Sequence, residues 1–160
     1  MDFSECRRIL DIGCGTGTCS AAIAASYPEI QCDLIDLPAV AAIAKDHVRM
    51  RGVEDRVHVS PGNYLADALP LGYDAALLLA VIHQEEPATI EALLRKTARS
   101  LNPGGRLISV HSWKQDGSDV QCIVLSRNAG GFRYRACIDG DIRIELSKKY
   151  EPSKSSVRMD

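Results

Sequence analysis

Short apolar runs alternate with segments of helical pattern along the first two thirds of this 160-residue sequence. The strand-like runs are residues 8–12, 31–36, 56–60, 73–83 and 106–110, of which 56–60 alternates between apolar and polar residues. Small or apolar residues recur at helical spacing in 18–26, 38–52 and 87–101. Strands that alternate with helices through short connections form a parallel sheet with right-handed crossovers. We therefore expect an α/β fold: a Rossmann-like, doubly wound, mostly parallel sheet with helices on both faces.

Length and composition are those of one globular domain. A chain of 160 residues is long enough to bury a core, and 46% hydrophobic with 25% charged residues is ordinary. We expect a single domain over residues 1–160, with its regular core in 8–112 and a less regular, substrate-side region in 113–160. The strand–helix rhythm fades after Ser112, so we expect the sheet to lack a complete C-terminal strand pair.

Charge and cysteine patterns argue against several classes of protein. The net charge is −2 with no long block of Lys or Arg, so no nucleic-acid partner is indicated. No apolar run approaches the ~20 residues of a membrane span, and the N-terminus lacks the layout of a secretory signal. The six cysteines show neither CxxC pairs nor cysteine–histidine ligand spacing. We expect no metal site, reduced thiols and a cytoplasmic protein.

Three alternate glycines follow the first apolar run, in the stretch DIGCGTGT at residues 11–18. Gly13, Gly15 and Gly17 allow the backbone to approach a ligand because no β-carbon intervenes. The spacing is GxGxG, whereas the dinucleotide fingerprint is GxGxxG, so a nicotinamide cofactor is disfavoured. Asp11 suits a ligand with an ammonium group and a positive sulfonium better than a pyrophosphate. A tight structural turn remains the alternative interpretation of the glycines.

A second acidic residue, Asp36, ends the second apolar run about 20 residues after the loop, where an acid can bind ribose hydroxyls. A helix-capping role before Pro38 is compatible with this function.

Five segments together resemble S-adenosylmethionine-dependent class I methyltransferases. They are DIGCGTGT, DLIDLPAV, RVHVSPGNYL, YDAALLLAVIHQEEP and LNPGGRLISV, in that order. The DLP after the second predicted strand and the IH that ends the fourth are similar to those of the acetylserotonin and plant-type small-molecule O-methyltransferases and their bacterial relatives. The resemblance covers residues 8–112, and a weaker similarity continues beyond them.

The resemblance implies S-adenosylmethionine as the cofactor and assigns its contacts. Asp11 and the glycines at 13, 15 and 17 would lie beside the methionine part. Asp36 would bind the ribose, and Leu37 would lie against the adenine. Asn63 stands where the family usually has an aspartate that bonds the adenine amino group. Its amide oxygen can still accept that bond, so weaker recognition is expected.

The resemblance also implies that His83 is the general base. Methyl transfer is an in-line displacement that needs alignment, and a hydroxyl acceptor additionally needs its proton removed, which an imidazole does well. Two departures weaken the expected base: Gln84 replaces a frequent aspartate, and His111 replaces a carboxylate that would orient the imidazole. Glu85 or Glu86 could substitute. His83 as a solvent-facing strand-end residue is the alternative.

These observations predict methyl transfer to oxygen in a small hydroxylated acceptor. The alternative function is a module that binds S-adenosylmethionine or S-adenosylhomocysteine without turnover, as a partner subunit. Family members carry an N-terminal helical domain that forms a dimer, and only seven residues precede the first apolar run here. We therefore expect either a homodimer or a fragment whose dimerisation domain is missing.

Overall fold

The computed structural model describes residues 2–82, 85–112, 120–128, 131–137 and 145–147. The helices are α1 (Thr18–Ser26), α2 (Pro38–Met50) and α3 (Pro87–Ser100). The strands are β1 (Arg8–Ile12), β2 (Gln31–Asp36), β3 (Val57–Pro61), β4 (Tyr73–Leu79), β5 (Leu101–Ser112), β6 (Val120–Asn128), β7 (Gly131–Cys137) and β8 (Glu145–Ser147). Both α2 and α3 begin at proline, whose fixed φ suits the first helical position.

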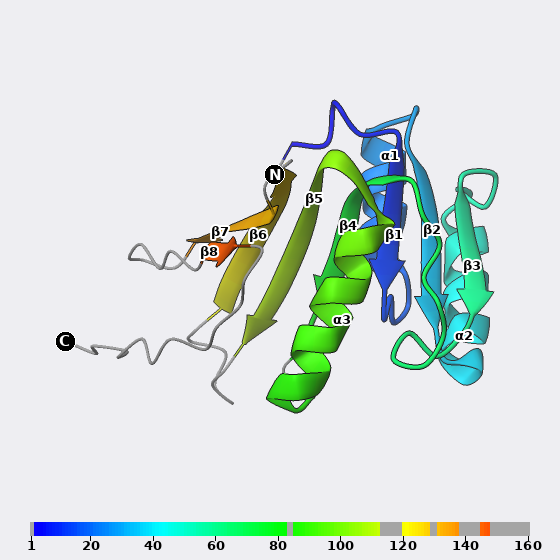
Figure 1. The fold of residues 1–160 in the computed structure, drawn as a ribbon. Helices are drawn as coiled ribbons and strands as arrows, with labels where there is room; N and C mark the ends of the chain where they lie inside the picture. Colours follow the sequence, from blue (N-terminus) through cyan, green and yellow to red (C-terminus); the bar gives the residue numbers. More distant parts are fainter. Residues whose placement is uncertain (1, 83–84, 113–119, 129–130, 138–144, 148–160) are drawn as a thin grey trace.

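One sheet contains all the described strands, in the order β3-β2-β1-β4-β5-β6-β7-β8 (Figure 1). The strands from β3 to β5 in this order pair in parallel, which confirms the predicted doubly wound sheet. Sequence pattern predicted an incomplete C-terminal strand pair, whereas the described residues after β5 form three antiparallel strands. The period-two pattern of β7, GFRYRAC, is the signal for this extension. Antiparallel neighbours need only tight connections, so no strand–helix rhythm marks them.

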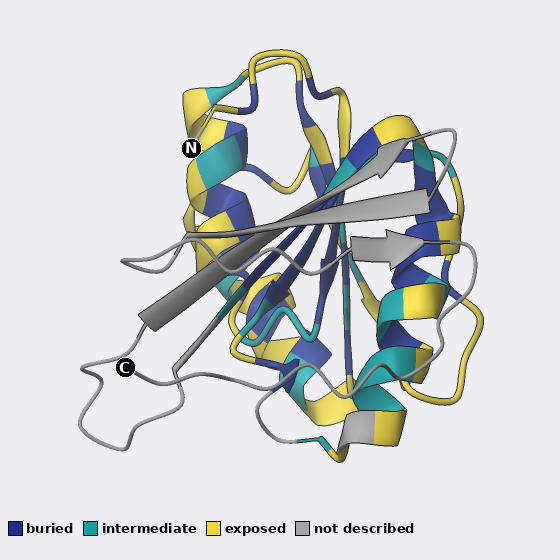
Figure 2. Cartoon of the chain, turned by 60° about the vertical axis from the view of Figure 1, so that its left-hand side comes forward, coloured by how far each residue is buried: buried dark blue, intermediate teal, exposed yellow. Residues whose placement is uncertain are grey.

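Helices cover both faces of the parallel part, α1 and α2 on one side and α3 on the other (Figures 1 and 2). Successive residues of β4 supply the two cores alternately. Ala75 and Leu77 pack in the core under α1 and α2, while Ala76 and Leu78 pack in the core under α3. Because side chains of a strand alternate between faces, a continuous apolar run is what a strand covered on both sides requires.

The crossover from β3 to β4, residues 62–72, contains no helix. It passes over the same face of the sheet as α3 (Figure 1), and Lys96 of α3 holds it: the Lys96 Nζ donates to the carbonyls of Leu65 and Asp67, at 3.1 and 2.8 Å. This connection positions Asn63 and its neighbours at the carboxyl edge of the sheet.

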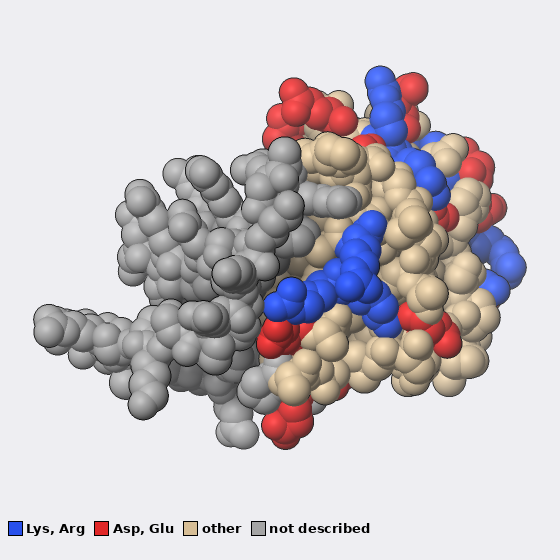
Figure 3. Space-filling view, in the orientation of Figure 1, with Lys and Arg blue, Asp and Glu red and all other residues tan. Residues whose placement is uncertain are grey.

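The surface carries charges of both signs. Figure 3 shows basic side chains over α3 with acidic side chains beside them. The ion pair between Arg95 and Glu91, 2.7 Å, lies along this helix. No helix among the described residues is long and apolar enough to cross a membrane.

Candidate functional site

The loop between β1 and α1 holds its three glycines in the left-handed region, at φ of 67°, 57° and 72°. A β-carbon at Gly13 would lie 2.7 Å from Val81 Cγ2, and one at Gly17 would lie 2.8 Å from Leu34 Cδ2. A β-carbon at Gly15 would meet nothing within 4 Å. Gly13 and Gly17 are therefore closed in by the protein, and Gly15 is the position that leaves room for a ligand.

Asp36, at the end of β2, anchors this loop. Its Oδ2 accepts the Gly15 N–H at 2.8 Å, and its Oδ1 accepts the Leu37 N–H at 2.7 Å. The side chain does not cap α2, because Leu37 is the N-cap and no side chain caps that helix. Asp36 is 7% exposed, and each carboxylate oxygen retains a lone pair for a further donor. Sequence patterns indicated a ligand contact here but not the bond to the loop.

Asp11, at the end of β1, is 1% exposed. Its Oδ2 accepts the Ser20 hydroxyl at 2.6 Å, whereas Oδ1 has no hydrogen-bond partner among the described residues. Burial raises the pKa of Asp11 to about 6, and the hydrogen bond from Ser20 opposes that rise. A buried carboxylate oxygen without a donor is costly, so an arriving cationic or N–H group would be favoured there.

Leu37 and Asn63 lie after neighbouring strands at this edge. Leu37 is 48% exposed, an apolar surface that a flat ligand could cover. Asn63 is exposed, and its Oδ1 accepts the Leu65 N–H at 3.0 Å. The Asn63 N–H donates to Asp67 Oδ2 at 2.7 Å. The amide oxygen that was expected to accept a ligand bond thus already closes a turn, with one lone pair left.

Tyr64 is a residue at this edge that sequence reasoning did not single out. Its ring lies 3.4 Å from the position of a β-carbon at Gly13. Burial raises the pKa of Tyr64, and the charges of Glu85 and Asp36 add to the effect. An aromatic residue directly after the Asn63 position was the signal available.

His83 and Gln84 lie outside the described residues, as does the side chain of His111. The backbone before His83 has a distinctive conformation, because Ala80 follows β4 with a φ of 57°. A left-handed alanine is costly, and such residues concentrate at functional sites. Its N–H donates to the Val110 carbonyl of β5 at 2.7 Å.

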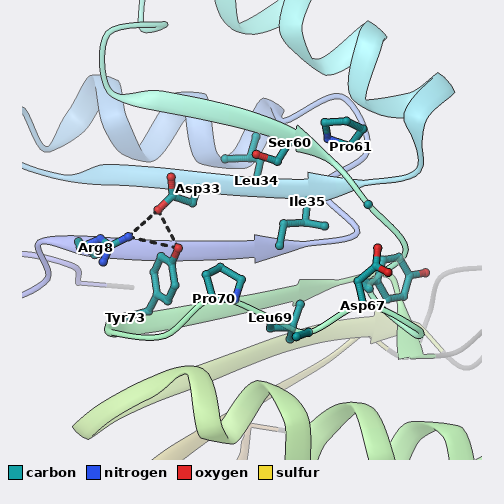
Figure 4. Close-up of a pocket in the computed structure, with 13 residues that line it drawn as sticks. Arg8, Asp33, Leu34, Ile35, Ser60, Pro61, Asp67, Leu69, Pro70 and Tyr73 are labelled. Carbon is teal, nitrogen blue, oxygen red and sulfur yellow. Dashed lines mark hydrogen bonds and ion pairs between the residues drawn. The ribbon is translucent and has the colours of Figure 1, made fainter.

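A cavity of about 440 Å³ lies under the 62–72 connection and extends from Arg8 and Tyr73, where β1 and β4 begin, to Gly62 at the carboxyl edge (Figure 4). At one end the Asp33 carboxylate accepts the Arg8 guanidinium at 2.9 Å and the Tyr73 hydroxyl at 2.8 Å. The negative charge of Asp33 at that end is therefore balanced by Arg8. None of the residues predicted to contact the cofactor lines this cavity.

No group of three or more His, Cys, Asp or Glu side chains in the described part of the chain is arranged to hold a metal ion. Cys6, Cys14, Cys19 and Cys32 are free thiols.

Comparison with known protein families matches residues 1–124 to the O-methyltransferase domain. This chain belongs to that family. The resemblance drawn from the five sequence segments is confirmed, and S-adenosylmethionine is the cofactor of the family.

Three similar proteins illustrate the family. Demethylspheroidene O-methyltransferase of Cereibacter sphaeroides is 37% identical over 108 residues, which cover 68% of this chain and 28% of that protein. Aclacinomycin 10-hydroxylase RdmB of Streptomyces purpurascens is 36% identical over 120 residues, covering 75% and 30%. PigF is a methyltransferase of Serratia. The solved structure of PigF with SAH (S-adenosylhomocysteine) has a TM-score of 0.66 and 35% identity, and the match covers 74% of this chain and 36% of that chain. The chain thus spans between 28% and 36% of these relatives.

Proposed function

We propose that this O-methyltransferase-family chain binds S-adenosylmethionine and transfers its methyl group to a hydroxyl oxygen of a small molecule. The observation that carries the proposal is the open space at Gly15, whose N–H is held by the Asp36 carboxylate. Asp11, in the strand that leads into this loop, adds a buried oxygen without a partner among the described residues. The residues present fit a ligand with an ammonium group at one end and a sugar at the other.

The amino-acid end of the cofactor would meet two complementary groups. Asp11 Oδ1 accepts the ammonium. Helix α1 has no side-chain cap at Gly17 and no acidic residue in its first turn. Its free N–H groups and positive end suit the carboxylate.

The nucleoside end would meet the neighbouring strand ends. Asp36 keeps one lone pair on each oxygen for ribose hydroxyls while it holds the Gly15 N–H. Leu37 offers its exposed side chain to the adenine face, and Asn63 offers the remaining lone pair of its amide oxygen to the amino group.

When bound, the cofactor supplies a methyl group activated by a positive sulfur. The chain's contribution is alignment and the removal of the acceptor's proton, for which His83 is the proposed general base. His83 comes four residues after the end of β4, and β4 pairs in parallel with β1. Because parallel strands present their carboxyl ends at one edge, this position follows the same edge as the glycine loop. The acceptor oxygen would donate its proton to the imidazole.

A module that binds the cofactor or SAH without turnover is the second candidate. A relative named as a 10-hydroxylase matches this chain at 36% identity, so family membership alone does not determine methyl transfer. Gln84 and His111 stand where the family has acidic residues, and this also favours the binding module. Neither side chain supplies the negative charge that stabilises an imidazolium.

The remaining features of the proposal concern the whole protein. We propose that residues 1–160 act as one cofactor-binding domain in the cytoplasm and act on a small-molecule acceptor. A homodimer, formed through a helical segment of the kind found in the family, is part of the same proposal.

Calorimetry with SAH and NAD tests cofactor binding. We expect SAH to bind, NAD not to bind, and Asp36→Ala to weaken SAH binding about tenfold or more, since it removes a charged acceptor. Asp46→Ala is the matched control, because Asp46 is an exposed aspartate on α2 paired with Arg49. Absence of SAH binding to folded wild-type protein would contradict the proposal.

A methyl-transfer assay on a panel of phenolic acceptors tests the base. His83→Ala should lower kcat by about a hundredfold or more while leaving SAH affinity unchanged. His58→Ala, at an exposed position of β3, is the control. Tight SAH binding with no acceptor methylated would favour the binding module, and full activity of His83→Ala would refute the base assignment.

A further inference from the structure

Ser20 of α1 is fully buried and forms a short hydrogen bond with a residue of the proposed cofactor site. Its Oγ donates to Asp11 Oδ2 at 2.6 Å, and neither side chain is reached by solvent. Ser26 on the same helix behaves differently, since its Oγ donates to the Ala22 carbonyl one turn earlier at 2.9 Å. Serines inside helices commonly make that backbone bond. The Ser20 hydroxyl instead donates its one hydrogen bond to a carboxylate.

The titratable groups that face Asp11 come from three elements. Asp36, at the end of β2, repels a charge on Asp11 and raises its pKa, in addition to the larger effect of burial. Cys14 in the loop, Cys19 on α1 and Cys32 on β2 have pKa values above their usual range, first because each thiol is partly shielded from water and also because Asp11 is near. These thiols are neutral around neutral pH. The Ser20 hydroxyl therefore favours the charged form of Asp11 against burial and Asp36.

We propose that Ser20 is a positioning residue: its hydroxyl fixes the Asp11 carboxylate in its ionised form and leaves Oδ1 as the acceptor for the ammonium group of the cofactor. The inference rests on the proposed function of the site. It follows from the geometry, since a carboxylate with one oxygen held at 2.6 Å and the other unpartnered in a buried setting has one acceptor position to offer.

The consequence is that the affinity for the cofactor depends on pH, and that Ser20 determines the pH at which it falls. The ammonium binds the ionised carboxylate, so affinity should fall as pH drops through the pKa of Asp11, about 6. Removing the hydroxyl removes a hydrogen bond to the charged form, so the midpoint of this fall should move up by about one pH unit.

The test measures SAH affinity by calorimetry between about pH 5 and pH 8, for wild type, Ser20→Ala and Ser26→Ala. A one-unit rise in the midpoint weakens binding to Ser20→Ala about fivefold near pH 6 and leaves it nearly equal to wild type near pH 8. Ser26→Ala should follow wild type at every pH. Ser20→Cys, which keeps the size of the side chain with a weaker donor, should fall between the two.

A second ligand, which lacks the amino-acid group, tests whether the effect of pH depends on the ammonium. 5′-Methylthioadenosine has the adenosine and the thioether but no amino-acid group, so its affinity should not follow Asp11 in any variant. The carboxyl resonance of Asp11, followed by NMR in the ligand-free protein, should titrate at higher pH in Ser20→Ala than in wild type.

Different outcomes contradict different claims. If the SAH profiles of Ser20→Ala and wild type coincide, or if Ser20→Ala loses the same factor at every pH, the inference is wrong and the proposed function stands. If SAH fails to bind folded wild type at any pH, the proposed function and its assignment of Ser20 both fall. The NMR titration then still reports whether Ser20 controls the charge of Asp11, and an unchanged titration overturns that part as well.

Discussion

The three glycines of the β1–α1 loop share one backbone conformation but differ in what surrounds them. A β-carbon at Gly17 would lie 2.8 Å from Leu34 of β2 and 3.6 Å from Val48 of α2, so the glycine allows α1 to pack against its neighbours. Gly15 faces open space and donates its N–H to Asp36. At the scale of single residues, one glycine is therefore required by packing, and another leaves open space beside the loop.

Alanine substitutions should separate these two roles. Gly15→Ala incurs only the left-handed backbone cost, about 1 kcal/mol, but should weaken SAH binding because its methyl group enters the open space. Gly17→Ala adds steric overlap with Leu34 and should lose about 1–3 kcal/mol more. Gly52→Ala, after α2, has a φ of 63° with nothing within 4 Å and is the control. Urea unfolding and calorimetry measure the effects, and equal unfolding midpoints for all three variants would contradict them.

At the scale of elements, one carboxylate ties three strands of the sheet together. Asp74 of β4 accepts the N–H groups of Arg7 and Arg8, at 2.8 and 3.0 Å, where β1 begins. It also accepts the side-chain amide of Asn102, in β5, at 2.8 Å. Burial acts to raise the pKa of Asp74, but these hydrogen bonds and the Arg8 charge outweigh it, so the pKa lies below the usual value. The amino ends of β1, β4 and β5 are thereby aligned, at the edge of the sheet opposite the glycine loop.

This arrangement predicts a pH-dependent stability difference. A depressed carboxyl pKa stabilises the fold above the unfolded value, about 3.9, and the contribution is lost as pH falls through the folded value. Asp74→Asn should therefore unfold at lower urea than wild type near neutral pH, and the gap should close below about pH 4. Asp46→Asn, at an exposed ion pair on α2, should show little gap at any pH. A gap that persists unchanged into acid would refute the assignment.

At the scale of the whole molecule, the parallel sheet separates two cores that depend on the same central strands. Leu77 and Leu78 are consecutive in β4, and both are buried, the first under α1 and α2 and the second under α3. Figure 2 shows the buried residues concentrated along these central strands and on the inward sides of the helices. Because β4 belongs to both layers, neither core can be lost without the other.

Leu77→Ala and Leu78→Ala should each destabilise the protein by about 2–5 kcal/mol, since each leaves a cavity in a packed core. Unfolding should remain a single transition when it is followed by far-ultraviolet and near-ultraviolet circular dichroism. Leu71→Ala, at an exposed leucine of the 62–72 connection, is the control. Two separate transitions in either core variant would show that the layers unfold independently.

Much of the fold was predictable because its signals are local. The runs around Ile9, Leu34 and Leu77 are apolar over lengths typical of strands, and Pro38 and Pro87 mark the helix starts where the structure has them. The strands after β5 were not predicted, because antiparallel pairing depends on partners brought together by the fold. The hydrogen bonds from Gly15 to Asp36 and from Ser20 to Asp11 were not predicted for a similar reason, since each joins residues distant in sequence.

The sequence by itself determined the order of strands and helices as far as β5, the glycine spacing and the family, since these depend on periodicity and on residues adjacent in the chain. The tertiary structure alone decided which glycine is open, which oxygen of Asp11 lacks a partner and which serine serves it. Burial and hydrogen bonding are properties of three-dimensional neighbourhoods, and the two hydrogen bonds that decide these features join residues 9 and 21 positions apart along the chain.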